Sequence, residues 1–249
     1  MNSQLPKKMK QDAIVEALFE VRFDSSDIGE VVVGRLSDVD SWADYTSVRL
    51  PQADIPERIR VADAAFKHVP TVEKTSPDKT RSIRIGPRVI SYHVYEPYPG
   101  GDSFEKELNN MLACLFDKIK DIQVSRLGFR CVNFLTVSKH KINGLNDLSL
   151  NLSVGGKQLL DNVNLAFMEN VGDKHTVVSK LASPQFLQPG SPTPTDLIAV
   201  IDIDIFTPEP YVSNDVNSLS EWISQARIYE KTNFFSFFSD ELKNSLVEE

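Results

Sequence analysis

Apolar and polar side chains alternate along several stretches of this chain. Residues 14–23 carry Val15, Ala17, Phe19, Val21 and Phe23 at every second position. Successive strand side chains point to opposite faces of a sheet, so this stretch predicts a strand with one apolar face. Comparable patterns predict strands over 82–95 (two segments around Gly86 and Pro87), 123–137, 148–154, 159–168, 175–187 and 197–206.

A longer period predicts helices. Residues 103–120 repeat apolar side chains every third or fourth position, which gives a helix one continuous apolar stripe: Leu108, Met111, Leu112, Leu115, Phe116 and Ile119. The same reasoning predicts a helix over 28–36, another from Ser218 onward, and a short one beginning near Ser239. Prolines interrupt 40–80, where we expect extended or irregular chain with one short strand or turn of helix, and 184–194, where we expect a loop.

The order of these elements predicts the fold class. Most connections between the predicted strands are short, and short connections join antiparallel neighbours. We therefore expect an α+β fold, with a largely antiparallel sheet and helices packed on one face. Residues 1–249 form either one domain or two intimately packed, weakly similar halves, 1–140 and 141–249.

Composition narrows the functional classes. The chain has 249 residues, 41% of them hydrophobic and 25% charged, with a net charge of −8. This acidic balance argues against a nucleic-acid binder, because phosphate affinity rests on clustered Lys and Arg. Two cysteines make no disulfide framework, no run approaches the ~20 apolar residues of a membrane span, and the N-terminus has no secretory pattern. We expect a cytoplasmic protein without membrane contact.

Charged residues share the polar face of four predicted strands: Glu16, Glu20 and Arg22; Arg84 and Arg88; Arg126 and Arg130; Asp202 and Asp204. One interpretation is a water-facing sheet surface with cross-strand ion pairs. The alternative is a polar cleft, in which Arg84, Arg88, Arg126 and Arg130 bind a phosphorylated ligand. Glu16, Glu20, Asp202 and Asp204 would then hold Mg²⁺.

Two further features bear on binding. Asn133 falls on the apolar side of its strand, where a buried amide needs a hydrogen-bond partner or a ligand. Four phenylalanines, Phe234, Phe235, Phe237 and Phe238, occupy five positions near the C-terminus. We expect that they cannot all face one core and that some lie against the first helix layer or contact a partner protein. The sequence contains no catalytic or cofactor motif, so no catalytic residue is assigned.

Four segments together give a resemblance to a family. They are Ile14-Val-Glu-Ala-Leu-Phe-Glu-Val-Arg-Phe23, Ile83-Arg-Ile-Gly-Pro-Arg88, Arg126-Leu-Gly-Phe-Arg-Cys-Val-Asn133 and Ile201-Asp-Ile-Asp204. This combination resembles a sporadically distributed, uncharacterised prokaryotic family of about this length. The family has more often an aromatic residue at the position of Cys131, so the chain departs from it there. The resemblance implies a prokaryotic source and a mobile defence or antitoxin-like setting, and it assigns no activity.

The sequence therefore favours a non-enzymatic cytoplasmic protein that binds another protein or itself. The runner-up is a Mg²⁺-dependent enzyme or sensor for a nucleotide or another phosphorylated small molecule, which would use the charged strand faces. The two hypotheses differ in a simple geometric respect. The enzyme needs its arginines and carboxylates to converge on one hollow, whereas the binding protein does not.

Overall fold

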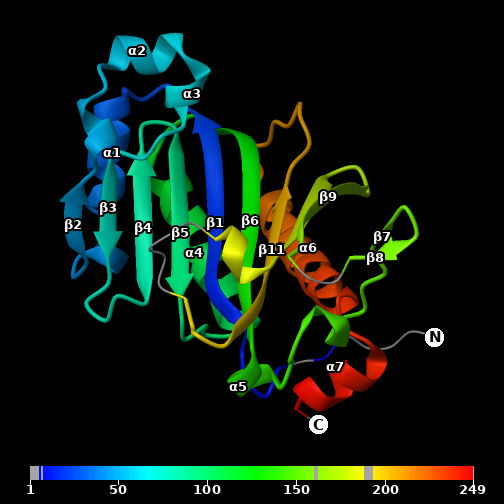
Figure 1. Ribbon diagram of the computed structural model, residues 1–249. Coiled ribbons are helices and arrows are strands. Elements are labelled where there is room, and N and C mark those ends of the chain that lie inside the picture. The colour runs from blue at the N-terminus through cyan, green and yellow to red at the C-terminus, as the bar shows by residue number, and fades with distance from the viewer. Residues whose placement is uncertain (1–5, 7, 160–161, 188–192, 249) are drawn as a thin grey trace.

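A nine-stranded antiparallel sheet organises the molecule, in the order β2-β3-β4-β5-β1-β6-β11-β10-β9 (Figure 1). The computed structural model describes residues 6, 8–159, 162–187 and 193–248. β1 and β6 are adjacent at the centre, so the sheet is continuous across residue 140. The strands are β1 Ile14–Asp24, β2 Thr46–Arg49, β3 Val72–Thr75, β4 Arg81–Gly86, β5 Val89–Tyr95, β6 Gln123–Thr136, β9 Asn164–Val171, β10 His175–Ala182 and β11 Leu197–Phe206.

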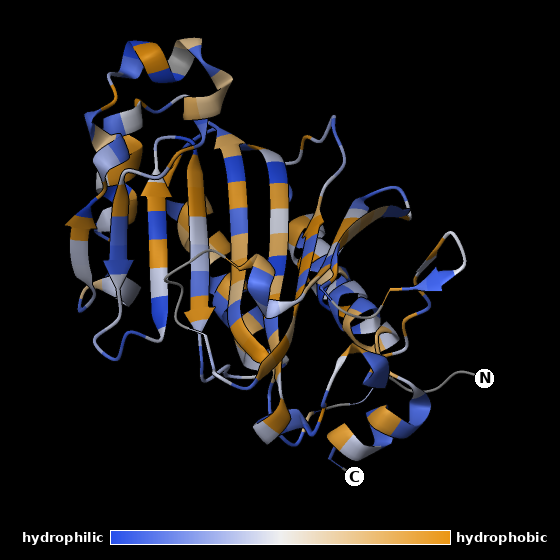
Figure 2. Ribbon diagram, viewed as in Figure 1, coloured by the Kyte–Doolittle hydropathy of each residue, from blue (hydrophilic) through white to orange (hydrophobic). Residues whose placement is uncertain are grey.

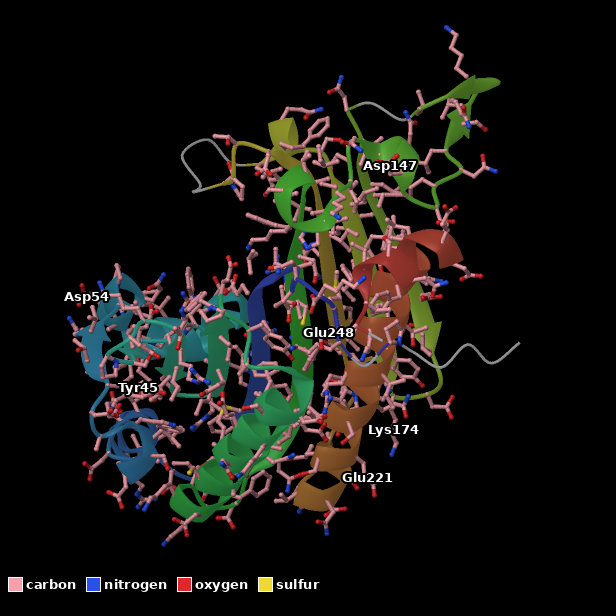
Figure 3. All side chains as sticks on the ribbon, turned by 90° about the horizontal axis from the view of Figure 1, so that it is seen from below. Tyr45, Asp54, Asp147, Lys174, Glu221 and Glu248 are labelled. Atoms are coloured by element: carbon pink, nitrogen blue, oxygen red, sulfur yellow. The ribbon has the colours of Figure 1, made fainter. Side chains whose placement is uncertain are left out.

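Two long helices, α4 (Gly101–Lys118) and α6 (Val216–Ser236), lie together on one face of this sheet (Figures 1 and 3). The apolar stripe expected for α4 is buried at Phe104, Leu108, Met111, Leu112 and Leu115. The hairpin turn that carries Lys174 lies beside the beginning of α6 near Glu221, since the indole nitrogen of Trp222 donates to the Lys174 carbonyl at 2.8 Å. The predicted α+β class, with helices packed against an antiparallel sheet, is confirmed.

The central strands have one apolar face, and the helices pack against it. Orange and blue residues alternate along β1 and β6 in Figure 2. Phe19 and Val21 of β1, like Leu127 of β6, are completely buried toward the helices. A bulge in the β1–β6 pairing turns Ile14 onto this same face, opposite Asn133, although Glu16 points to the other face. Bulges re-aim side chains in this way.

The connecting segments contain more regular structure than the sequence predicts. Residues 40–80 form two strands and several short helical turns, where one short strand or turn of helix was expected: β3 pairs with β4, and β2 pairs with β3 at the edge of the sheet. Of the strand expected over 148–154, only Ser153–Val154 is a strand, and it pairs with Lys157–Gln158 in a short hairpin. The proline-rich loop at 184–194 falls partly, at 188–192, outside the described residues. The remaining elements are α1 Gly29–Ser37, η1 Asp40–Trp42, η2 Pro51–Asp54, α2 Glu57–Ala62, α3 Ala64–Lys67, α5 Val137–His140, η3 Leu145–Asp147, β7 Ser153–Val154, β8 Lys157–Gln158, η4 Pro184–Phe186 and α7 Asp240–Leu246.

The phenylalanine cluster corrects one expectation. Phe234, Phe235, Phe237 and Phe238 are all buried, with exposed fractions of 4%, 5%, 4% and 2%. α6 ends at Ser236, and its last turn tightens: the Phe237 amide donates to the Phe234 carbonyl and the Phe238 amide to the Phe235 carbonyl, both at 3.2 Å. Phe238 packs edge-on against Phe234 at 5.0 Å between ring centroids. The idea that these rings cannot share one core was therefore wrong, and they offer no exposed docking surface.

Across the described residues, no helix is both long and apolar enough to cross a membrane.

Candidate ligand-binding cavity

A cavity of about 840 Å³ lies on the helix side of the sheet. Its walls come from four places in the sequence: the N-terminal segment at residues 8–12, the start of α4 with the loop before it, the second half of α6, and the central strands. The sheet contributes Ile14, Phe129 and Asn133. The bulge in β1 is thus part of the cavity's construction, because it places Ile14 on this wall.

Glu230 is the carboxylic acid inside this cavity. It lies on the buried stripe of α6 between Ala226 and Phe234, and only 9% of it is exposed. Burial raises the pKa of its carboxyl from 4.5 to about 7, and the negative charge of Asp12 adds to this effect. Lys231 and a hydrogen bond from the Asn133 side chain oppose it. At neutral pH this group is therefore poised between its two protonation states.

Asn133 meets Glu230 from the sheet. The amide is 1% exposed, and its Nδ2 donates to the Ile201 carbonyl oxygen on β11 at 3.2 Å. The sequence favours a buried amide that ties its strand to a neighbouring loop; the amide is buried, but its partner lies on the adjacent strand β11 and not on a loop. Asn133 also lines the cavity, so the second interpretation, a ligand contact, stays a prediction.

Arg227 closes the side of the cavity next to α4. It donates to Asp102 Oδ1 at 2.8 Å and to the carboxylate of Glu105, which also accepts from the Ser224 hydroxyl. The guanidinium lies against Gly101, where an added Cβ would stand 2.5 Å from Nη2 of Arg227. Two carboxylates thus already neutralise this arginine, and it joins α4 to α6.

Aromatic and aliphatic groups form the rest of the lining. Phe129, Phe234 and Phe235 are nearly fully buried, whereas Tyr98 is half-buried and Ile228 is 49% exposed. Burial raises the pKa of Tyr98, so its hydroxyl stays protonated and able to donate. Asp12 lines the cavity but is exposed, and its Oδ1 accepts from the Ile14 amide at 3.1 Å. Although the residue is exposed as a whole, partial desolvation of the Asp12 carboxyl by the surrounding protein raises its pKa.

The charged strand faces predicted from the sequence lie on the opposite side of the sheet from this cavity. There Arg22 and Arg126 are directly opposite each other across β1 and β6. Both bind the same oxygen of Glu20, at 2.7 and 3.0 Å. The Arg126 guanidinium also stacks over the Phe206 ring at 4.9 Å from its centroid. Arg126 is therefore held on both sides by the protein itself.

Arg130 is paired just as firmly. It forms a bidentate pair with Asp202 at 2.7 and 2.8 Å, and Lys180 approaches the same carboxylate at 3.6 Å. Asp204 lies opposite Arg130 in the β6–β11 register. Burial raises the pKa of Asp204, although the charges of Arg126 and Arg130 oppose that rise.

The remaining candidates stand apart from these. Arg84 pairs with Glu73 on β3 at 3.4 Å, and two strands, β5 and β1, separate it from β6. Arg88 donates to the backbone carbonyls of Pro87 and Asp27. Glu16 binds Nδ1 of His93 at 3.1 Å, and this hydrogen bond holds the pKa of the Glu16 carboxyl below its usual value.

The four arginines are therefore spread over the sheet instead of gathered around one anion. Three of the candidate metal carboxylates, those of Glu16, Glu20 and Asp202, each bind a basic side chain of the protein. In the part of the chain that the structure describes, no three or more His, Cys, Asp or Glu side chains are arranged to hold a metal ion. The pairs include the cross-strand ion pairs of the first interpretation, but the face is not simply water-facing, because Asp202 is only 9% exposed.

Comparison with protein-family models gives no match for this chain, and comparison with curated proteins gives none either.

Sequence reasoning missed Glu230, although a signal was present. The residue stands four positions after Ala226 and four before Phe234, where the α6 stripe should be apolar. A carboxyl at such a position is as unusual as the amide of Asn133 on its strand. Taken together, the two polar residues on two apolar faces predict one shared polar site. Tyr98, Arg227 and Asp12 gave no comparable signal.

Proposed function

We propose that this chain is a non-enzymatic binding protein that receives a small organic molecule in the cavity between α4 and α6. One observation carries the proposal: Glu230 and Asn133 project from two otherwise apolar faces into a cavity of about 840 Å³. Ligand sites have this character, with a mostly apolar lining and a few placed polar groups. Burying a carboxyl also costs stability, so its presence there favours a functional role over a packing role.

The chain ends support this proposal. Met9 pairs with Val247 in an isolated β-bridge, and the Lys10 amide donates to the Leu246 carbonyl at 2.8 Å. The Glu248 amide, at the end labelled in Figure 3, donates to the Lys8 carbonyl at 3.1 Å. The N-terminal wall of the cavity is thus fastened to the C-terminal helix α7, which gives the ligand site a defined shape.

The biological setting is part of the same proposal. We place the protein in the cytoplasm of a prokaryote, in a defence or antitoxin-like context, where ligand binding would alter its association with a protein partner or with itself. The sequence resemblance to a prokaryotic family supports this setting. Since the C-terminal phenylalanines are buried, the partner surface lies elsewhere on the molecule.

We also propose that the two halves repeat one plan. The strand orders β3-β4-β5-β1 and β9-β10-β11-β6 support this, because each half begins with a central strand. Its last strand returns beside that central strand and leads into a long helix, α4 or α6. In this plan the cavity lies where the helices of the two halves meet, a preferred place for ligand sites.

Native mass spectrometry after incubation with a small-molecule extract of the source cells tests the proposal. Wild-type protein should retain a bound mass that Ile228→Trp loses, because Ile228 lines the cavity and a larger side chain there obstructs it. Ile59→Trp, at another exposed isoleucine on α2, is the matched control and should retain the mass. Equal retention by both variants, or no bound mass at all, would contradict a ligand site in this cavity.

A further inference from the structure

The inner end of the cavity combines a buried acid with apolar walls. Glu230 and Asn133 meet there, and Phe129, Phe234 and Phe235 surround them with aromatic surface. An aromatic ring attracts a cation through its negative face. A carboxylate placed beside several rings is therefore suited to a positively charged group attached to an apolar body.

The other acids and bases that line the cavity are equal in number, so Glu230 supplies the excess negative charge of the lining. The ionisable side chains that line the cavity come from the N-terminal segment (Lys8 and Asp12), from α4 (Asp102 and Glu105) and from α6 (Arg227, Glu230 and Lys231). Among these described residues, four are acids and three are bases. Arg227 is paired with Asp102 and Glu105, and Lys8 binds Glu248 at 3.2 Å. The lining sheet positions carry no charge.

We infer that the cavity recognises a small organic cation, a primary amine on an aryl or alkyl body, whose ammonium group binds the Glu230 carboxylate. This inference deepens the proposed function and rests on it. Asn133 would orient the carboxylate by its hydrogen bond, and the aromatic wall would hold the apolar body. Asp12, exposed at the cavity lining, would add favourable charge on the path inward.

Binding of an ammonium group to Glu230 should release a proton to solvent. Without ligand, the Glu230 carboxyl keeps its proton up to about pH 7, because burial opposes its ionisation. An entering ammonium stabilises the carboxylate, so the carboxyl proton leaves to solvent while the ammonium keeps its own protons. One proton released per ligand makes affinity rise roughly tenfold per pH unit below that pKa and level off above it. A neutral or anionic ligand releases none.

Three probes with one skeleton test this inference: 4-phenylbutylamine, 4-phenylbutanol and 4-phenylbutyrate. Titration calorimetry at pH 5.5 and pH 8, in two buffers of different ionisation enthalpy, measures both affinity and proton release. We expect the amine to bind best, to bind more than tenfold tighter at pH 8, and to release close to one proton at pH 5.5. Glu230→Gln should lose this pH dependence and at least tenfold in affinity, since an amide cannot ionise.

Glu221→Gln is the matched control, because it makes the same change on an exposed position of the same helix, and it should bind like wild type. The pH dependence of the wild-type protein is a second readout that needs no variant to fold. Failure of the amine to bind at millimolar concentration overturns the inference. Equal or tighter binding of the alcohol or the acid, lost in Ile228→Trp, would overturn the amine assignment while leaving the cavity as a ligand site.

Discussion

Asn133 on β6 and Glu230 on α6 meet across the interface between sheet and helix, and a hydrogen bond from the amide moderates the pKa of the carboxyl. Each residue interrupts an apolar face of its own element. A ligand site in the cavity would explain why a polar residue stands on each of these two apolar faces. A smaller cavity of about 550 Å³ is lined by Arg22 and Arg126 on the other side of the sheet, where Glu20 already pairs with both arginines.

Replacing Glu230 by Gln should stabilise the protein in a pH-dependent way. Below pH 4.5 the carboxyl is protonated in both folded and unfolded chains, so it costs nothing. Between pH 4.5 and 7 the unfolded chain ionises while the folded carboxyl, with its pKa near 7, does not, so wild-type stability falls as the pH rises. Urea denaturation should show Glu230→Gln gaining up to roughly 3 kcal/mol on wild type between pH 4.5 and pH 8. A difference independent of pH, or one shared by Glu221→Gln, would refute this cost.

Removing the amide at Asn133 should raise the pKa of Glu230 further. The Asn133 side chain lowers that pKa by its hydrogen bond, so Asn133→Leu removes the effect and leaves a more apolar surrounding. Carboxyl-carbon NMR titration of Glu230 measures the change. Val132→Leu, on the neighbouring position whose side chain faces away from the helices, is the control and should leave the pKa in place. An unchanged pKa in Asn133→Leu would mean that the two side chains do not interact.

Substitution by alanine should change the stability of the protein in different ways at two glycines. Gly34 lies in helix α1 with open space around the new Cβ, so Gly34→Ala should stabilise by about 0.5–1 kcal/mol. At Gly101 the Cβ would stand 2.5 Å from the Arg227 guanidinium and displace it from Asp102 and Glu105. Thermal unfolding should therefore show no gain, or a loss of about 1 kcal/mol, for Gly101→Ala. Equal stabilisation by the two variants would show that Arg227 moves without cost.

The ion pair between Arg130 and Asp202 should contribute more than an exposed pair. Its geometry is bidentate and the Asp202 side chain is 12% exposed, whereas Arg49 and Asp54 form a single contact with side chains 67% and 73% exposed. We expect Asp202→Asn to cost about 1–3 kcal/mol of unfolding free energy. Asp54→Asn should cost about 0–1 kcal/mol. Chemical denaturation measures the unfolding free energy of both variants. Equal small losses would mean that the Arg130–Asp202 pair contributes no more stability than an exposed ion pair.

Local pattern was enough to predict the sheet and its main helices. Residues 14–23, with apolar side chains at every second position, form β1, and the segment after residue 102, with apolar side chains at every third or fourth position, forms α4. Each element buries one apolar face, and this face produces the pattern in the sequence. Short connections then implied antiparallel pairing. Residues 40–80 contain more regular structure than predicted because β3 is ordered by pairing with β4 and β2 by pairing with β3, contacts that their own composition does not encode.

The site was harder to predict for a related reason. Asn133 and Glu230 are far apart in sequence, and only the packing of α6 on β6 brings them to one cavity. The sequence also does not reveal the bulge that turns Ile14 toward the cavity. Strict alternation would place Ile14 on the same face as Glu16. The buried phenylalanines required knowledge of where α6 ends.

NMR titration of the Glu230 carboxyl, with and without 4-phenylbutylamine, tests the central claim most directly. We expect a pKa of about 7 for Glu230 in the free protein, because the carboxyl is buried in the cavity. Saturation with the amine should lower it toward the ordinary value of a glutamate, because the ammonium stabilises the ionised form. A pKa near 4.5 in the free protein, or one that the amine leaves unchanged, would contradict the claim that Glu230 is the recognition group of a cation site.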